Sequence, residues 1–172
     1  ILFKSDISMS TPKLPIDAVA RGRLPILLRH AWYGLNQAFR RRIAHLELTP
    51  DQYTALRTLH EHGKITQKEL ARLMASDPNT IASLMDRMES CGFVAREQDE
   101  RDRRARRLCL LPAGRRKYQA GRELAQRLQE QVISALAEEE RPLFLSQLAA
   151  VAEACRAASQ PSPRPNGERT RT

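Results

Sequence analysis

The stretch from Thr66 to Leu111 reads TQKELARLMASDPNTIASLMDRMESCGFVAREQDERDRRARRLCLL. Thr66 and Glu69 have the spacing of a capping box, in which each side chain binds an amide at the start of a helix. Apolar residues then recur at helical spacing as far as Met74. After Gly92 the period changes from helical to extended, so the stretch predicts a helix, a turn, a second helix and a pair of strands.

The second helix of this pair is predicted to have two different faces. Either Ser76 or Asp77 can cap it, and the proline that follows is tolerated in a first turn. An apolar stripe is formed by Ile81, Leu84, Met85 and Met88. The opposite face carries Asn79, Thr80, Ser83 and Arg87. Short polar groups followed by an arginine suit base edges and phosphates in a DNA major groove, although a merely solvated face is the alternative.

The segment between the two predicted strands is strongly basic. The strands are the apolar runs 93–97 and 107–111, which form a plausible antiparallel pair. Between Arg101 and Lys117 there are eight basic residues and one acid, a local net charge of +7 against +9 for the whole chain. Beside a helix-turn-helix pattern, such a concentration of charge favours a DNA-contacting wing over a solvated loop.

Composition and motifs exclude several classes of protein. The chain has 172 residues, 41% of them hydrophobic, which is enough for one core, and it has no apolar run of about 20 residues that would predict a membrane span. No signal-peptide layout is visible, so a cytoplasmic location is expected. Cys91, Cys109 and Cys155 are widely spaced, which predicts neither disulfides nor a zinc site. No catalytic or metal-binding constellation appears, so we expect no enzyme activity, metal or cofactor.

Further helices flank this central stretch. A long helix is predicted from about Asp17 or Pro25, with an apolar stripe as far as Leu46, and another follows the cap at Thr49. After the wing, helices are predicted over about 113–137 and around Leu145–Cys155. These stripes exceed what one winged-helix core can bury, so pairing with a second copy of the chain is expected.

The fold prediction is mainly α with a small two-stranded antiparallel wing. It comprises a winged helix-turn-helix at 48–112 and a helical dimerisation layer made of 17–47 and 113–158. Residues 1–16 are expected to be disordered or not native to the protein, and the proline-rich 159–172 to be a disordered tail.

Residues 20–158 resemble the MarR family of bacterial transcriptional regulators. The matching segments are LTPDQY at 48–53, TQKELA at 66–71, MDRME at 85–89, GFVAR at 92–96, DRRA at 102–105 and LPAG at 111–114. The Asp-x-Arg of the wing followed by an apolar strand is the most specific of these. Two departures stand out. Pro112 occupies a position where the family usually has Thr, and Pro142 lies early in the last helix, which is expected to start later or to bend.

The pattern and the resemblance together predict a sequence-specific DNA-binding regulator, a repressor acting as a homodimer on a palindromic operator in double-stranded DNA. It would be associated with the nucleoid through that DNA. The predicted DNA contacts are Thr66, Gln67, Ser76, Pro78, Asn79, Thr80, Ser83, Arg87, Arg103, Arg104 and Arg106. Arginines at the wing tip are expected to enter the minor groove, and Asp102 to orient one of them by an ion pair.

The resemblance also implies a small aromatic or phenolic acid as an effector that releases the DNA. The residues that could line its site are Arg29, His30, Trp32, Tyr33 and Tyr53. Trp32 also fits the apolar stripe of the first helix, so a place in the core or the dimer interface is the alternative. Two further functions stay open: a redox-responsive regulator that uses a cysteine, and a basic architectural nucleic-acid-binding protein without an operator.

Overall fold

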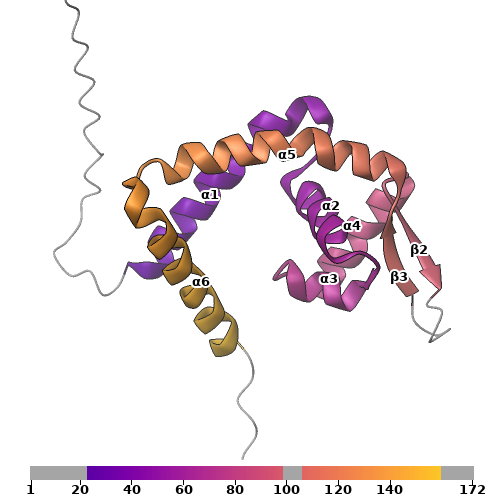
Figure 1. The fold of residues 1–172 in the computed structure, drawn as a ribbon. Coiled ribbons are helices and arrows are strands. Elements are labelled where there is room, and N and C mark those ends of the chain that lie inside the picture. Colours follow the sequence, from indigo (N-terminus) through magenta and orange to yellow (C-terminus); the bar gives the residue numbers. More distant parts are fainter. Residues whose placement is uncertain (1–22, 99–105, 160–172) are drawn as a thin grey trace, which may run out of the picture.

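The computed structural model describes residues 23–98 and 106–159. In chain order the elements are α1 (Leu24–Ile43), the 3₁₀ turn η2 (Ala44–Leu46), α2 (Pro50–His62), β1 (Ile65–Thr66), α3 (Gln67–Leu73), α4 (Pro78–Ser90), β2 (Val94–Gln98), β3 (Arg106–Leu110), α5 (Pro112–Ile133), the 3₁₀ turn η3 (Glu138–Glu140) and α6 (Arg141–Ala158). Figure 1 shows α5 running from the sheet to α6, with a lobe of α2, α3, α4 and the sheet at one end. This arrangement confirms the predicted winged helix-turn-helix with additional helices from both ends of the chain.

Three helices of the lobe begin at side-chain caps. Thr49 and Gln52 form a capping box at α2, and Thr66 and Glu69 form another at α3. At α4 the cap is Asp77, whose Oδ1 accepts from the backbone amides of the second and third helical residues at 3.0 and 2.9 Å. The sequence allowed either Ser76 or Asp77 as the cap of this helix, and the structure shows that it is Asp77.

The core lies inside this lobe. The predicted inner stripe of α4 is buried, with Ile81, Met85 and Met88 fully so. These side chains belong to one cluster with Leu56 of α2, Leu70 of α3 and apolar residues of the sheet. Burial of such side chains stabilises the lobe by about 1.5–3 kcal/mol each, so the orientation of α4 is strongly constrained.

The sheet has one strand more than the sequence analysis expected. The strand order is β1-β3-β2, and both pairings are antiparallel. The predicted pair is present, with Val94 opposite Leu110 and Gln98 opposite Arg106. The additional strand β1 has only two residues, which is too short for an alternating pattern to reveal it.

The last two helices differ slightly from their predicted limits. α5 ends at Ile133 rather than near residue 137, with Ser134 as its C-cap, and a short turn separates it from η3. At the start of α5, Pro112 occupies the first turn and Leu111 provides no side-chain cap. Pro142 likewise lies in the first turn of α6, where a proline costs no hydrogen bond, so this helix begins directly at Arg141.

Close packing against two glycines fixes α5 on the lobe. A Cβ atom at Gly114 would lie 2.3 Å from the carbonyl oxygen of Phe93 and 2.8 Å from the side chain of Leu110. At Gly121 it would lie 2.8 Å from the ring of Tyr53. The first half of α5 therefore approaches the sheet and α2 more closely than any larger residue would allow.

We expect Gly114→Ala to destabilise the fold by about 1–3 kcal/mol, because the backbone of Phe93 cannot yield as a flexible side chain would. Urea denaturation followed by circular dichroism measures this change. Gly34→Ala in α1 is the control, since its Cβ meets nothing within 4 Å. That substitution should be neutral or stabilise by up to about 1 kcal/mol. Equal effects of the two substitutions would contradict the close-contact explanation.

Candidate nucleic-acid interface

The polar face of α4 is exposed as predicted. Asn79, Thr80, Ser83 and Arg87 all lie on the outside of the lobe. Thr80 also hydrogen-bonds the cap: its side chain and its backbone amide bind the carboxylate of Asp77 and lower the pKa of that group. Among the described residues, Asn79, Ser83 and Arg87 have no side-chain hydrogen bond or ion pair. Their polar groups are therefore available to an outside partner.

The predicted contacts around α3 have structural partners of their own. The Thr66 hydroxyl accepts from the amide of Glu69 at 3.2 Å, and its backbone amide donates to the Glu69 carboxylate at 2.7 Å. The hydrogen bond from the backbone amide of Thr66 is the main reason that the pKa of Glu69 lies below its usual value. Gln67 has its side-chain oxygen 3.5 Å from a nitrogen of Arg96. Ser76 is half-buried and Pro78 is exposed in the first turn of α4. DNA contact by these four residues stays a prediction.

Part of the basic run holds the scaffold together. Arg107 donates to the carbonyl of Lys64 at 3.1 Å, linking β3 to the chain before β1. Lys117 donates to the carbonyl of Leu46 at 2.6 Å and is thereby held beside η2. Arg106 is exposed at the start of β3. Arg103, Arg104 and Asp102, the predicted wing-tip contacts and orienting residue, lie outside the described residues.

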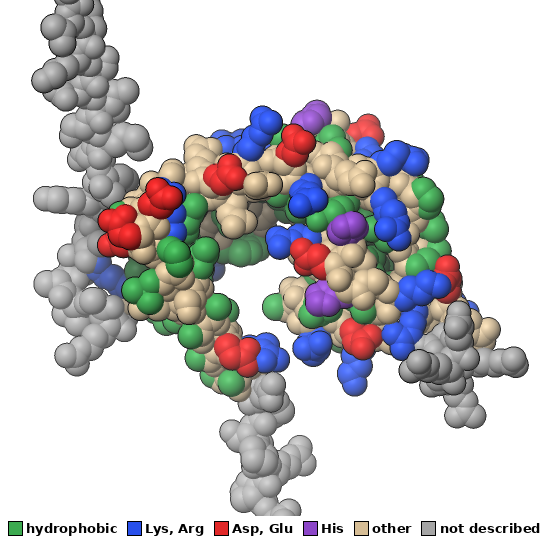
Figure 2. Space-filling view, in the orientation of Figure 1, with side chains coloured by type: hydrophobic (Ala, Val, Ile, Leu, Met, Phe, Trp, Pro, Cys, Tyr) green, Lys and Arg blue, Asp and Glu red, His purple; other side chains and the backbone are tan. Residues whose placement is uncertain are grey.

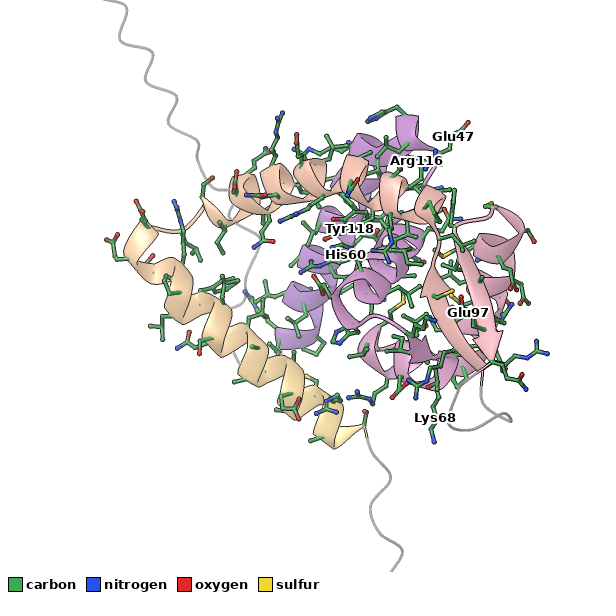
Figure 3. The ribbon with its side chains drawn as sticks, turned by 45° about the vertical axis from the view of Figure 1, so that its right-hand side comes forward. Glu47, His60, Lys68, Glu97, Arg116 and Tyr118 are labelled. Carbon is green, nitrogen blue, oxygen red and sulfur yellow. The ribbon has the colours of Figure 1, made fainter. Side chains whose placement is uncertain are left out.

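Cations gather on the winged-helix lobe, whereas α6 presents mostly hydrophobic side chains (Figure 2). Lys68 and Arg72 of α3 are both exposed, and Figure 3 shows Lys68 pointing away from the body of the lobe. The sequence analysis did not include these two residues among the DNA contacts. Their helical spacing of four places them on one side of α3, which was the available signal.

Sequence reasoning also missed a group of charged residues at the base of the wing. Arg96 of β2 forms ion pairs with Asp86 and Glu89 of α4, the first of them at 2.7 Å. The guanidinium of Arg96 is largely covered, with the side chain 19% exposed. The signal was a carboxylate on the polar side of α4 and an arginine after the helix-ending Gly92. Only the folded chain brings them together.

Two cavities lie between the lobe and the flanking helices. The larger, of about 530 Å³, has mostly apolar walls from α1, α2, α5 and α6 and includes Trp32 and Tyr53. The smaller, of about 370 Å³, is lined by α1, the start of α2 and α4 and includes Trp32, Tyr33 and Arg87. Arg29 and His30, also predicted to bind an effector, are exposed on α1 and line neither of these cavities. Trp32 is 64% exposed, so it does not belong to the core of the protomer.

The cysteines give little support to redox sensing within the described residues. Cys109 is buried in the sheet, and burial raises the pKa of its thiol, as does its hydrogen bond to Glu97. A raised pKa disfavours the reactive thiolate. Cys91 and Cys155 are exposed and free. In the same described part of the chain, no group of side chains has the arrangement of a metal site, and no helix is long and apolar enough to cross a membrane.

The fold and the exposed polar helix define a winged helix-turn-helix transcriptional regulator, and comparisons with known proteins agree. The model of the MarR family matches residues 48–105. Transcriptional regulator HosA of Escherichia coli is 30% identical over 124 residues, which cover 69% of this chain and 92% of that protein.

Solved structures extend the likeness to the whole fold. A MarR family protein from Bacillus stearothermophilus is 33% identical with a TM-score of 0.63, and the match covers 78% of this chain and 94% of that one. The transcriptional repressor CouR, bound to a 23-mer DNA duplex, is 26% identical with a TM-score of 0.69, over 79% and 99% of the two chains. The chain belongs to the MarR family of DNA-binding transcriptional regulators.

We expect Asn79→Ala and Ser83→Ala to relax base preference at particular positions of the bound DNA, by about 1–3 kcal/mol where a bidentate contact is lost. Selection of duplexes from a random pool by each variant measures this preference. Ser90→Ala is the control, because the Ser90 hydroxyl donates to the backbone carbonyl of Asp86 at 2.9 Å. Unchanged preference in both variants would show that Asn79 and Ser83 do not read the bases.

Proposed function

We propose that this protein is a repressor that binds a palindromic operator in double-stranded DNA as a homodimer. The observation that carries the proposal is the exposed polar face of α4, whose Asn79, Ser83 and Arg87 have no partner among the described residues. With the opposite face buried in the core, α4 can offer only this face to a major groove. Repression would follow from occupying a promoter, which places the protein's action on the chromosome in the cytoplasm.

A second copy of the chain would cover the exposed apolar side chains of α1 and α6. These residues are Leu24, Ile26, Leu27, Trp32, Leu35, Leu143, Phe144, Leu145 and Leu148, each at least 39% exposed. A monomer rarely exposes so many large apolar side chains on neighbouring helices. In Figure 1 α6 and the beginning of α1 lie away from the lobe, at the far end of α5. A two-fold axis at that end would leave the two α4 helices free to enter successive major grooves, about 10 base pairs apart.

Selection from a random pool of duplexes tests operator binding. Enriched sequences should contain two inverted half-sites whose centres lie about 10 base pairs apart. The affinity for the selected duplex should exceed that for random duplex or for single-stranded RNA by at least about 10³-fold. Equal affinity for all three would instead identify a non-specific architectural protein.

Sedimentation tests the dimer. The wild-type protein should have about twice the chain mass of 19.6 kDa at micromolar concentration. Leu148→Glu should shift the equilibrium towards monomer, because it places a charge in the apolar contact. Ser146→Glu, on the same helix at an exposed polar position, is the matched control. A wild-type monomer that still binds the selected duplex tightly would contradict the dimer.

The smaller cavity fits a small aromatic acid as the effector that releases DNA. Trp32 and Tyr33 offer ring surfaces, while Arg40 and Arg87 offer guanidinium groups for a carboxylate. Since Arg87 also belongs to the exposed face of α4, an acid that engages it would compete directly with DNA for the same side chain. The larger cavity has mainly apolar walls that include α6, and the second copy of the chain would cover it.

Trp32 is the only tryptophan of the chain and lines both cavities, so its fluorescence reports a ligand in either of them, and the Arg40 variant distinguishes the smaller one. Titration with a hydroxybenzoate should quench the emission and release the selected duplex over the same concentration range. Arg40→Gln should weaken both effects, and Arg127→Gln, on the exposed surface of α5, should change neither. DNA release without any change in fluorescence would place the effector elsewhere.

A further inference from the structure

The outward face of α4 carries a carboxylate that a DNA-reading helix would not need. Asn79, Ser83, Asp86 and Ser90 follow one another at intervals of four, three and four residues, so they lie in one row. Asp86 is 68% exposed. An unpaired carboxylate in this row would be repelled by DNA phosphates. Its role therefore depends on what neutralises it.

Arg96 supplies the opposite charge from outside the helix. From β2 its Nη2 atom donates to Asp86 Oδ1 at 2.7 Å, and its Nη1 atom donates to Glu89. The backbone amide of Arg96 also donates to Glu89 Oε1, at 3.2 Å. On its other side, Nη2 lies 3.5 Å from the side-chain oxygen of Gln67 in α3. One guanidinium thus joins α3, α4 and β2.

The arginine of this group is more covered from solvent than that of an ordinary surface ion pair. The Arg96 side chain is 19% exposed, and burial alone would lower its pKa, but the hydrogen bonds to Asp86 and Glu89 together with the negative charges of these carboxylates raise it. An arginine fork that binds two carboxylates has a defined direction, unlike a lysine ammonium. Besides these bonds, β2 is joined to α4 by the helix-ending turn at Gly92, where φ is +68°, and by the packing of Val94 in the core cluster that contains Met85 and Met88.

We propose that Arg96 is a positioning residue for DNA binding, which holds the β2–β3 hairpin at a fixed angle to α4 and neutralises Asp86. It makes no contact with DNA itself. The hairpin and α4 then approach the duplex as one rigid unit. The proposal rests on α4 as the DNA-reading helix, and the test separates the two claims.

The test measures affinity for a duplex selected by the wild-type protein, across a series of salt concentrations. Arg96→Gln should weaken binding by at least about fivefold, within the range expected for coupled groups. The slope of log affinity against log salt should stay unchanged, because no phosphate contact is lost. Arg87→Gln, the contact comparison, should flatten that slope by about 2 in a dimer, at about 0.9 for each phosphate contact. Arg127→Gln, whose partner Glu123 is equally exposed, should bind like the wild type.

The variant that removes a negative charge separates the hypotheses most clearly, because they predict opposite changes in DNA affinity. Glu89→Gln should weaken DNA binding, whereas electrostatics alone predicts stronger binding to a polyanion. In combination with Arg96→Gln the two losses should not add, because both break one group of bonds. Arg96→Lys keeps the charge and should recover part of the affinity.

Two outcomes would contradict the role of Arg96. A flattened salt slope in Arg96→Gln would make Arg96 a direct phosphate contact. Unchanged affinity in both Arg96→Gln and Glu89→Gln would make the group a stabilising ion pair only. Should Arg96→Gln fail to fold, as judged by circular dichroism, Arg96→Lys and Glu89→Gln decide on the same criteria. If the wild-type protein selects no duplex, the proposed operator binding fails and not the role of Arg96 alone.

Discussion

Ile81, Met85 and Met88 have no surface in contact with solvent, and their packing against α2 and α3 fixes the rotation of α4 about its own axis. Rotating α4 about its axis by the angle of one residue, about 100°, would expose these side chains and bury Asn79 or Ser83 in their place. The loss would amount to several kcal/mol from apolar exposure and unpaired polar groups. The chemistry that the lobe presents to its surroundings therefore follows from the packing of its interior.

Local signals made most of this fold predictable. Capping residues such as Thr49 and Thr66 act over three residues, and the inner stripe of α4 repeats within one helix, so both can be read from the sequence. The third strand was not predictable, because β1 pairs with β3 across more than 40 residues and is only two residues long. The group around Arg96 was missed for the same reason: its members come from three elements and carry no common spacing. The charge count over 101–117 also included Lys117 and Arg107, and both donate to backbone carbonyls of the scaffold.

The two ends of the molecule have opposite surface chemistry. Cations surround the lobe, and α6 is covered by leucine, valine, alanine and phenylalanine (Figure 2). No residue of α6 is buried within the protomer, although its sequence is more apolar than that of any lobe helix. Between the two ends, aromatic rings contact one another in a row from Phe39 through Tyr53 to Tyr118 and His60. Figure 3 shows the last two side by side. This row connects the larger cavity with the outer surface of α2.

Because α5 is held closely at Gly114 and Gly121, a small tilt at this end of the helix produces a larger displacement at its other end. Both glycine contacts lie in its first half, whereas its second half has a buried Leu128 and contacts α1. A helix of 22 residues is about 33 Å long, and a tilt of about 5° around the fixed end moves the far end by about 3 Å. Conversely, if α6 is held still, the same tilt displaces the lobe. A shift of a few tenths of an ångström at Tyr53 relative to Phe93 would thereby be magnified about threefold at the end of α5.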